Sequence, residues 1–323
     1  MNLQGLGKIE SFQTYLDIAF QRGTARVVET KKLKIKDPLA KTKETERQRI
    51  DTITRSLTDS LGRIERCFPS IDDLDPFYLE LIKCALDYVL LKKSLGALNW
   101  AGKQIKSVQY EVKGRLYGAR TADHVIKARV AFSGRVSSVM KQIKKNLEYL
   151  EEARKIMKSF PSIKTDINTV VIAGFPNVGK TTLLAALTGS TPKIAHYPFT
   201  TQTLNLGYEG KEIQYVDTPG LLDRPLSARN PIERQAIIAL KHVAKIILFV
   251  IDPTETCGYT VKQQKNLLLE IKKAFKLPII LVSNKADQNV EFEKAMKVSA
   301  KEKTGIDELK KEIKKELNNE VNA

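Results

Sequence analysis

The chain has 323 residues, of which 42% are hydrophobic and 28% charged, a balance typical of a globular protein and not of a disordered or fibrous one. This length allows two ordinary domains, each with its own core. The formal net charge of +17 favours a partner that carries negative charge, either nucleic acid phosphates or anionic lipid heads. A basic surface that only keeps the protein in solution is the remaining interpretation.

Several classes of protein are disfavoured by simple patterns. No apolar run is as long as the roughly 18 residues that a membrane-spanning helix needs. Acidic residues, Glu10 and Asp17, interrupt the region where a signal peptide has its apolar core, so we expect a cytoplasmic protein. The three cysteines show no ligand spacing and the three histidines are scattered, which favours reduced thiols over disulfides or a Cys/His metal site.

The positive charge is concentrated in the N-terminal half. Residues 1–164 hold 32 Lys+Arg against 19 Asp+Glu, whereas residues 165–323 hold 22 against 18. Residues 101–164 alone hold 15 against 5. The N-terminal half is therefore the expected binding region for a polyanion.

Apolar residues in this half recur at three- and four-residue steps, which predicts helices. Arg22–Arg49, with ten basic and four acidic residues and little periodicity, is predicted to be an exposed arm or irregular connection. Helices are expected within Asp51–Ile64 and Leu79–Leu98. Between them, the two prolines of Phe68–Tyr78 indicate a loop, in which Asp75 is a plausible N-cap and Pro76 the first helical residue.

A long helix is predicted from near Asp123 to Ser159, ending before Pro161 because the residue before a proline avoids the α region. Its apolar stripe consists of Val136, Met140, Ile143, Leu147, Leu150 and Met157. Such a stripe is typical of a core-facing helix. Residues 1–164 are therefore predicted to form a basic, all-α helical bundle domain without a catalytic site.

The second half begins with a phosphate-binding pattern. Thr169–Ala173 is a β-branched run typical of a buried strand, and the residues from Gly174 to Thr181 fit G-x-x-x-x-G-K-[ST]. A strand, a glycine-rich loop and a helix start direct backbone N–H groups at phosphates. Lys180 is predicted to meet the β- and γ-phosphates, and the Thr181 hydroxyl to ligate Mg²⁺. The nucleotide-contacting residues of this loop are predicted to be Asn177, Val178, Gly179, Lys180, Thr181 and Thr182.

Two sequence motifs, here called boxes, follow, and their residues are predicted to contact the γ-phosphate or its Mg²⁺. The loop His196–Thr203 offers a threonine that would complete the Mg²⁺ shell, and Thr201 is preferred for this role with Thr200 as its rival. Strands Thr203–Tyr208 and Lys211–Val216 are expected to form a hairpin. The sequence Asp-Thr-Pro-Gly then places Asp217 to hold Mg²⁺ through a water and the Gly220 N–H to meet the γ-phosphate.

Two further boxes indicate guanine. Strand Ile279–Ser283 leads into Asn-Lys-Ala-Asp, whose carboxylate at Asp287 can accept from both N1–H and the N2 amino group of guanine, a pair that adenine lacks. Asn284 can tie this loop to the P-loop, and the Lys285 stem can cover the base. Ser299, Ala300 and Lys301 follow the strand around Met296–Val298, and the Ala300 N–H is predicted to meet guanine O6.

Together these boxes predict an α/β P-loop GTPase domain over residues 165–323, with a mostly parallel sheet and helices on both faces. The predicted residues that act on GTP are Lys180, Thr201 and Gly220, and the predicted metal ligands are Thr181, Thr201 and Asp217. A metabolic P-loop kinase is excluded because it would lack the guanine box. A nucleotide binder without turnover is the remaining alternative.

The sequence also resembles a known family. Tyr197–Thr201 and Pro176-Asn177 look like the Obg-type GTPases of the translation-factor class. The segments that follow Asp217 and Arg229, with Phe68–Tyr78, are similar to the nucleolar GTP-binding protein family of large-subunit ribosome assembly. The resemblance covers nearly the whole chain and implies a short, archaeal-type member whose partners are large-subunit rRNA and ribosomal proteins of the pre-ribosome.

The resemblance also bears on mechanism. Leu221 occupies the place where Ras-like proteins carry the water-orienting glutamine, so intrinsic hydrolysis is expected to be slow. In potassium-stimulated relatives an asparagine at the place of Asn177 binds the ion, so K⁺ joins GTP, GDP and Mg²⁺ among the expected ligands. A role of Asn177 in its own loop's hydrogen bonding is an equal alternative.

Two functions from different classes stay open. One is a GTP-gated assembly factor whose helical domain binds rRNA. The other is a GTPase on an anionic membrane surface or a signalling partner, which is disfavoured because the long helix lacks a Trp/Phe-rich apolar face and no acylation motif is present. The oligomeric state cannot be read from the sequence.

Overall fold

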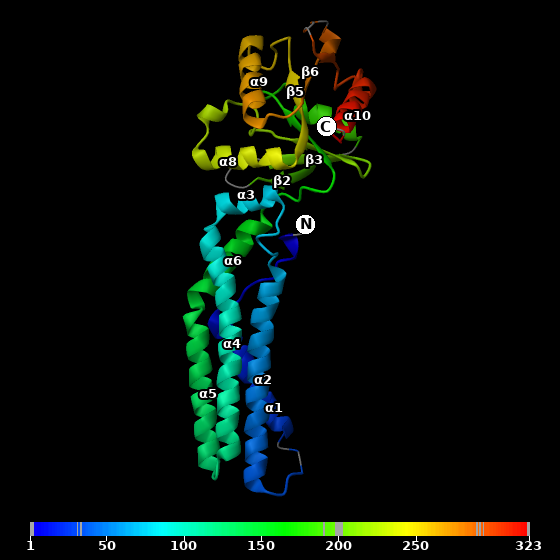
Figure 1. Cartoon of the computed structure of the whole chain (residues 1–323). Coiled ribbons are helices and arrows are strands. Elements are labelled where there is room, and N and C mark those ends of the chain that lie inside the picture. Colours follow the sequence, from blue (N-terminus) through cyan, green and yellow to red (C-terminus); the bar gives the residue numbers. More distant parts are fainter. Residues whose placement is uncertain are drawn as a thin grey trace. The chain divides into compact units, whose positions relative to one another are not determined.

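The computed structural model of the chain (Figure 1) describes residues 3–30, 32, 34–189, 191–197, 203–288, 290, 292 and 294–321. The chain forms two compact units. Residues 4–73 and 86–158 make up the helical unit, and residues 74–85 and 159–323, with the first three residues, make up the GTPase unit. Each unit has its own core.

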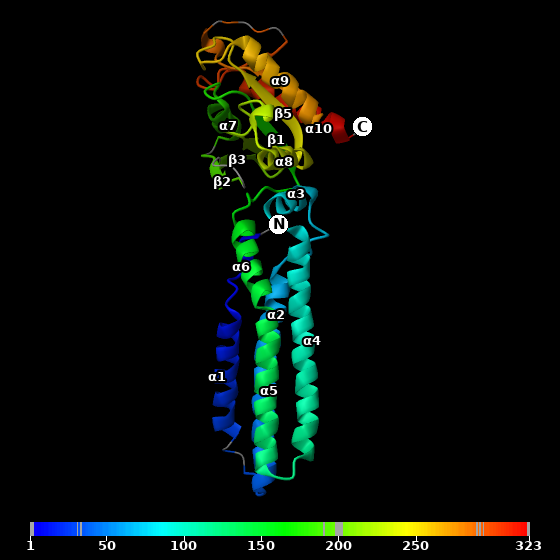
Figure 2. The same ribbon diagram turned by 90° about the vertical axis from the view of Figure 1, so that its left-hand side faces the viewer.

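The helical unit consists of long helices that lie side by side (Figure 2). They are α1 (Phe12–Thr30), α2 (Pro38–Cys67), α4 (Tyr88–Gly118), α5 (Ala122–Gln142) and α6 (Lys144–Lys158), after a 3₁₀ turn at Leu3–Gly5. Fully buried side chains at helical spacing, among them Ile50, Ile105 and Phe132, form the core between them. This confirms the all-α domain. Within the described residues, no helix has the length and apolar character that crossing a membrane requires.

The prediction of an irregular arm over Arg22–Arg49 is wrong. Its first part belongs to α1 and its last part to α2, which Asp37 caps by accepting hydrogen bonds from the N–H groups of Leu39 and Ala40. Val27 and Thr45 are buried among otherwise charged neighbours. Only a few positions of these two helices face inward, and charged residues surround them in the sequence. The helical periodicity of the apolar residues is therefore not visible in this segment.

Two predicted helices are each broken in two. The helix expected from Asp123 to Ser159 is interrupted at Ile143, whose backbone leaves the helical region (φ −90°, ψ 8°) while its side chain stays buried. The helix expected over Leu79–Leu98 is interrupted before Asp87, which accepts a hydrogen bond from Leu90 N and starts α4. No glycine or proline in the sequence marks either break. The predicted start of α3 (Pro76–Ala85) at Pro76, after Asp75, is confirmed.

The GTPase unit is built on a seven-stranded sheet with the order β2-β3-β4-β1-β5-β6-β7. The strands are β1 (Asn168–Ala173), β2 (Lys193–His196), β3 (Thr203–Glu209), β4 (Ile213–Asp217), β5 (Ala244–Ile251), β6 (Ile279–Ser283) and β7 (Met296–Lys297). The pairs β2–β3 and β3–β4 are antiparallel and the other pairs are parallel. The mostly parallel sheet and the β3–β4 hairpin are confirmed. Strand β5, which is apolar apart from Lys245, and the edge strand β2 are additional findings.

Helices cover both faces of this sheet, as predicted (Figure 1). They are α7 (Lys180–Thr188), α8 (Pro231–Ala239), α9 (Val261–Phe275) and α10 (Ile306–Val321). The crossovers through α8 and α9 step along the sheet in one direction and that through α7 in the other, so right-handed connections put them on opposite faces. α10 packs beside α7.

One helix of the N-terminal half belongs to the GTPase unit. The buried Tyr78 hydroxyl of α3 donates to the carbonyls of Pro161 and Ile163, at 3.0 and 2.8 Å. On α8, Gln235 Nε2 donates to Glu80 of α3 at 3.4 Å. The predicted single boundary after residue 164 therefore does not match the compact units, because α3 belongs to the GTPase unit. Within that unit, α3 lies against α8, the helix that follows the second switch.

Candidate nucleotide-binding site

The P-loop follows β1 and has the backbone shape that its glycines permit. Gly174 and Gly179 both have positive φ, at 139° and 96°. A Cβ at Gly174 would lie 2.4 Å from the Val250 carbonyl oxygen, and one at Gly179 would lie 2.2 Å from Asn284 Nδ2. Only glycine fits either place, because both the conformation and the space exclude a side chain.

Lys180 begins α7 and folds back over the loop. Its Nζ donates to the carbonyls of Gly174 and Phe175, both at 2.8 Å. Burial lowers its pKa, while the negative charges of Asp217 and Asp223 oppose this shift. The two carbonyl dipoles therefore stabilise the charge of the ammonium group within the loop. Asn177 is exposed at the tip with φ 62°, a left-handed conformation that asparagine tolerates.

The two described candidates for Mg²⁺ are in contact. The Thr181 hydroxyl donates to Asp217 Oδ2 at 2.7 Å, and Asn205 Nδ2 donates to the same oxygen at 2.9 Å. The other oxygen, Asp217 Oδ1, is buried and has no hydrogen-bond partner among the described residues. A buried carboxylate oxygen without a donor is a place where a cation or a water compensates the charge.

The first switch cannot be assessed, because Thr200 and Thr201 lie outside the described residues. The loop that carries them leaves β2 through Tyr197, which is buried and donates a 2.5 Å hydrogen bond to the Ala236 carbonyl of α8. The base of the first switch is thus bonded to the helix that follows the second.

The second switch is held by Arg229, a residue to which the sequence analysis assigned no role. Gly220 has φ 73°, and its carbonyl accepts from the Arg229 guanidinium. The same nitrogen, Nη2, donates to Leu221 O at 2.9 Å and contacts Asp223 Oδ1 at 3.3 Å. The Arg229 side chain is 1% exposed. Directly after it, Asn230 and Glu233 form a capping box that starts α8.

The guanine box is joined to the P-loop as expected. Asn284 Nδ2 donates to the Val178 carbonyl at 2.8 Å, and its Oδ1 accepts from Ala300 N at 3.0 Å. The second contact changes one expectation, because the N–H predicted to meet guanine O6 is engaged by Asn284. Binding O6 there requires Ala300 N–H to be shared or exchanged.

Asp287 is oriented by the last box. Ser299 Oγ donates to its Oδ1 at 2.6 Å, a bond that lowers the pKa of this carboxyl and keeps it an acceptor. Thr182, Ala300 and Lys301 line one groove of about 670 Å³. The structure thus brings the predicted P-loop and base residues to one edge of the sheet, at the carboxyl ends of β1 and β6.

Asp252 is a residue of this site that sequence reasoning missed. It directly follows β5, is fully buried and accepts from Lys285 Nζ at 2.6 Å, as well as from Cys257 N and the hydroxyls of Thr254 and Thr256. Burial raises the pKa of Asp252, but the bonds from Lys285 and Thr254 outweigh it and leave the pKa lowered. The sequence does contain a signal for this residue, because the aspartate directly follows a wholly apolar run. That run ends at the same edge of the sheet as the other motifs.

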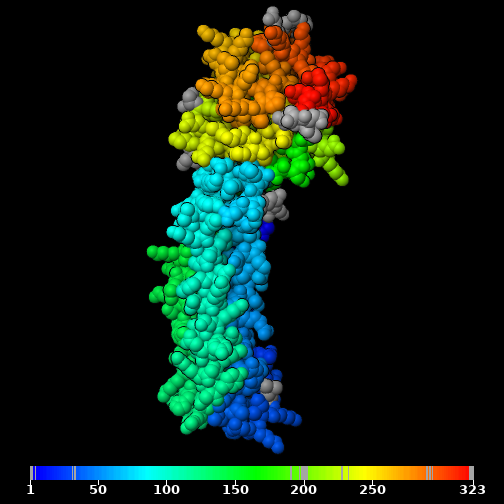
Figure 3. All heavy atoms as spheres, viewed as in Figure 1, coloured from blue at the N-terminus to red at the C-terminus, as the bar shows by residue number. Residues whose placement is uncertain are grey.

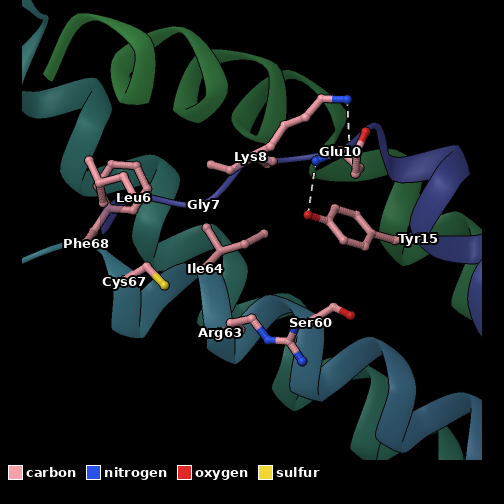
Figure 4. Close-up of a pocket in the computed structure, with 11 residues that line it drawn as sticks. Leu6, Gly7, Lys8, Glu10, Tyr15, Ser60, Arg63, Ile64, Cys67 and Phe68 are labelled. Atoms are coloured by element: carbon pink, nitrogen blue, oxygen red, sulfur yellow. Dashed lines mark hydrogen bonds and ion pairs between the residues drawn. The ribbon is translucent and has the colours of Figure 1, made fainter. Parts of the chain in front are cut away.

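A separate cavity of about 210 Å³ lies within the helical unit (Figure 4). The segment from Leu6 to Glu10 forms one side and the end of α2 the other, with Arg63, Cys67 and Phe68. Glu10 N donates to the Tyr15 hydroxyl at 3.1 Å, and Lys8 pairs with Glu10 at 3.0 Å. These polar groups are bonded to one another, so nothing here is comparable to the P-loop site.

Comparison with known proteins agrees with this geometry. The NOG1 N-terminal helical domain model matches residues 9–164, and the nucleolar GTP-binding protein 1 model matches residues 231–287. An uncharacterized protein of Methanocaldococcus jannaschii is 45% identical over 77% of this chain and 71% of its own. Nucleolar GTP-binding protein 1 of Encephalitozoon cuniculi is 38% identical over 70% of this chain but only 44% of its own. The chain thus spans less than half of that longer relative.

A solved structure is also similar. It is a Plasmodium falciparum protein described as a nucleolar GTP-binding protein 1, 29% identical, with a TM-score of 0.44 over 50% of this chain and 92% of that one. The relatives, the two matched family models and the P-loop and guanine boxes point to one assignment. The chain belongs to the nucleolar GTP-binding protein 1 family and is a P-loop GTPase.

Proposed function

We propose that this GTPase is a switch in the assembly of the large ribosomal subunit and that its helical unit binds rRNA. The observation that carries the proposal is the charge of residues 1–164, with 32 basic against 19 acidic side chains, beside a complete set of GTP boxes. Named relatives are nucleolar GTP-binding proteins, and the nucleolus is where ribosomal subunits assemble. We place the protein in the cytoplasm.

The proposed route of coupling stays within the GTPase unit. Arg229 holds the Gly220 and Leu221 carbonyls and lies directly before the capped start of α8. α8 in turn lies against α3, whose neighbours in sequence on both sides belong to the helical unit. A change at Gly220 on loss of the γ-phosphate would therefore displace α8 and α3, from which the chain continues into the helical unit.

The proposal includes Mg²⁺ and K⁺ as ions of the site. The buried, unpartnered Asp217 Oδ1 beside the Thr181 hydroxyl suits a hard cation that is bound through oxygen ligands. Mg²⁺ bound there would neutralise phosphate charge, and Lys180 would hold the β- and γ-phosphates. The exposed amide of Asn177 is placed to offer an oxygen to K⁺, in a site whose Leu221 cannot orient water.

A co-sedimentation experiment tests this function against its rival, a GTPase on anionic membranes. Full-length protein is pelleted with large ribosomal subunits and, separately, with phosphatidylserine vesicles, over a series of salt concentrations. We expect binding to the subunits with a linear fall of log affinity against log salt. Reversing the charges of the exposed Lys141, Lys144 and Lys145 should flatten this slope without changing GTP affinity. Binding to vesicles alone would contradict the proposal.

A further inference from the structure

The outward face of α4 has an unusual combination of exposed aromatic rings and unpaired cations. We propose that this face docks an unpaired RNA strand, whose bases stack on Tyr110 and Tyr117. The inference rests on the proposed function, in which the helical unit binds RNA, and it names the surface and the kind of RNA that the surface takes.

The two tyrosines are not part of the core. Tyr110 is 83% exposed and Tyr117 is 67% exposed. They lie seven positions apart, which is two turns or about 10.5 Å along the helix on one side. The buried positions of α4, such as Ile105 and Val112, lie on the opposite side. Within the described part of the chain, neither hydroxyl makes a hydrogen bond, so folding alone does not account for the two rings.

Cations flank the rings on the same side of the helix. Lys106 and Lys103 lie one and two turns before Tyr110, are exposed, and form no ion pair with any residue that the structure describes. Lys43 of α2 contacts the backbone at the second tyrosine, with its Nζ donating to the main-chain carbonyl of Tyr117 at 2.9 Å. The acidic residue of α4, Glu111, is already paired with Arg135 at 2.7 Å. Lys113, between the rings, is paired with Asp51 at 2.6 Å, so the uncompensated positive charge of this face is that of Lys103 and Lys106.

The surface between the rings is open to close approach. Gly114 lies there, and a Cβ built on it would meet no atom within 4 Å. Glycine is disfavoured within a helix, and the packing of this chain does not require it at that position. In the space-filling view of the helical unit (Figure 3), α4 runs along the visible face and no other element covers it.

These features together fit an unpaired nucleic acid strand. Every base has a flat face that stacks on an aromatic ring whatever the sequence, and lysines beside the rings neutralise the phosphates between stacked bases. Paired bases hide these faces, so a duplex could use the lysines but not the tyrosines. A membrane surface would call for large apolar neighbours around the rings, whereas Lys103, Lys106 and Gly114 occupy these positions.

The test measures the binding of the protein to a fluorescent, unstructured RNA oligonucleotide and to a blunt-ended RNA duplex of equal length. The double variant Tyr110→Ala/Tyr117→Ala should bind the unstructured RNA about tenfold more weakly or worse, as expected for two lost stacking contacts. Tyr110→Phe/Tyr117→Phe keeps both rings and should bind as wild type does. Duplex affinity and GTP affinity should be unchanged in both variants, which also controls for folding.

The possible failures are distinguishable. If the alanine variant binds unstructured RNA as wild type does but still pellets with large subunits, the α4 surface is refuted and the proposed function stands. If wild type binds neither RNA nor subunits, both proposals fall. Loss of subunit binding with unchanged RNA affinity would mean that a ribosomal protein covers this face. Loss confined to anionic vesicles would mean that a membrane does.

Discussion

The GTPase unit and the helical unit place their functional side chains in different ways. In the GTPase unit several motif residues are held by specific partners: Asn284 bonds to the P-loop, Lys285 to Asp252, and Arg229 to the carbonyls of the second switch. In the helical unit, Tyr110 and Lys103 project from a helix whose other side forms the core. A nucleotide site needs fixed geometry, whereas a polyanion surface needs only accessible charge and rings. Mutations should therefore act differently in the two units.

The largest effect is expected at the base-recognition box. Asp287→Asn replaces one acceptor by a donor and removes the negative charge, so guanine loses one hydrogen bond and the charge assistance of the other, and GTP affinity should fall about 100-fold or more. The new amide donor suits the C2 carbonyl of xanthine, so xanthosine triphosphate should bind better than GTP. Competition assays with GTP, XTP and ATP measure this, and Ser299→Ala, which removes the bond that orients Asp287 but keeps its carboxylate, should have a smaller effect. ATP competing equally with GTP in wild type would show that Asp287 does not select the base.

The second effect concerns the link between the second switch and α8. Arg229→Ala removes a buried cation that is bonded to two carbonyls, so the free energy of unfolding should fall by about 3 kcal/mol. Arg224→Ala, at an exposed position five residues earlier, is the matched control and should have little effect. Urea unfolding followed by circular dichroism measures both. Equal midpoints for the two variants would mean that Arg229 does not fasten the switch.

The third effect concerns the ion at the P-loop. Because Leu221 cannot orient water, a cation near the β–γ bridge should raise the rate, and we expect hydrolysis at least about tenfold faster in KCl than in NaCl. Asn177→Ala should abolish the difference while leaving GDP affinity nearly unchanged. Phosphate release in matched salts gives the comparison. A wild type with the same rate in both salts would assign the missing stabilisation to a protein or RNA activator instead.

The two units also differ in how much of their structure the sequence alone predicts. The GTPase boxes could be predicted because G-x-x-x-x-G-K-[ST] and Asn-Lys-Ala-Asp have spacings that the backbone requires, as the Cβ distances at Gly174 and Gly179 show. The breaks at Ile143 and before Asp87 could not, since helix packing causes them and no helix-breaking residue marks them. The insertion of α3 into the GTPase unit was hidden as well. It depends on the hydroxyl of Tyr78 reaching carbonyls more than 80 residues away.

The central claim is that the nucleotide held in one unit controls what the other unit binds. The most direct test is the affinity of full-length protein for large ribosomal subunits, measured at one salt concentration with GDP and with a non-hydrolysable GTP analogue. A switch of this kind predicts affinities that differ by at least about fivefold, the lower end of allosteric coupling. Arg229→Ala, which breaks the link to α8, should reduce that ratio toward one. Equal affinities for the two nucleotide states of wild type would contradict the account.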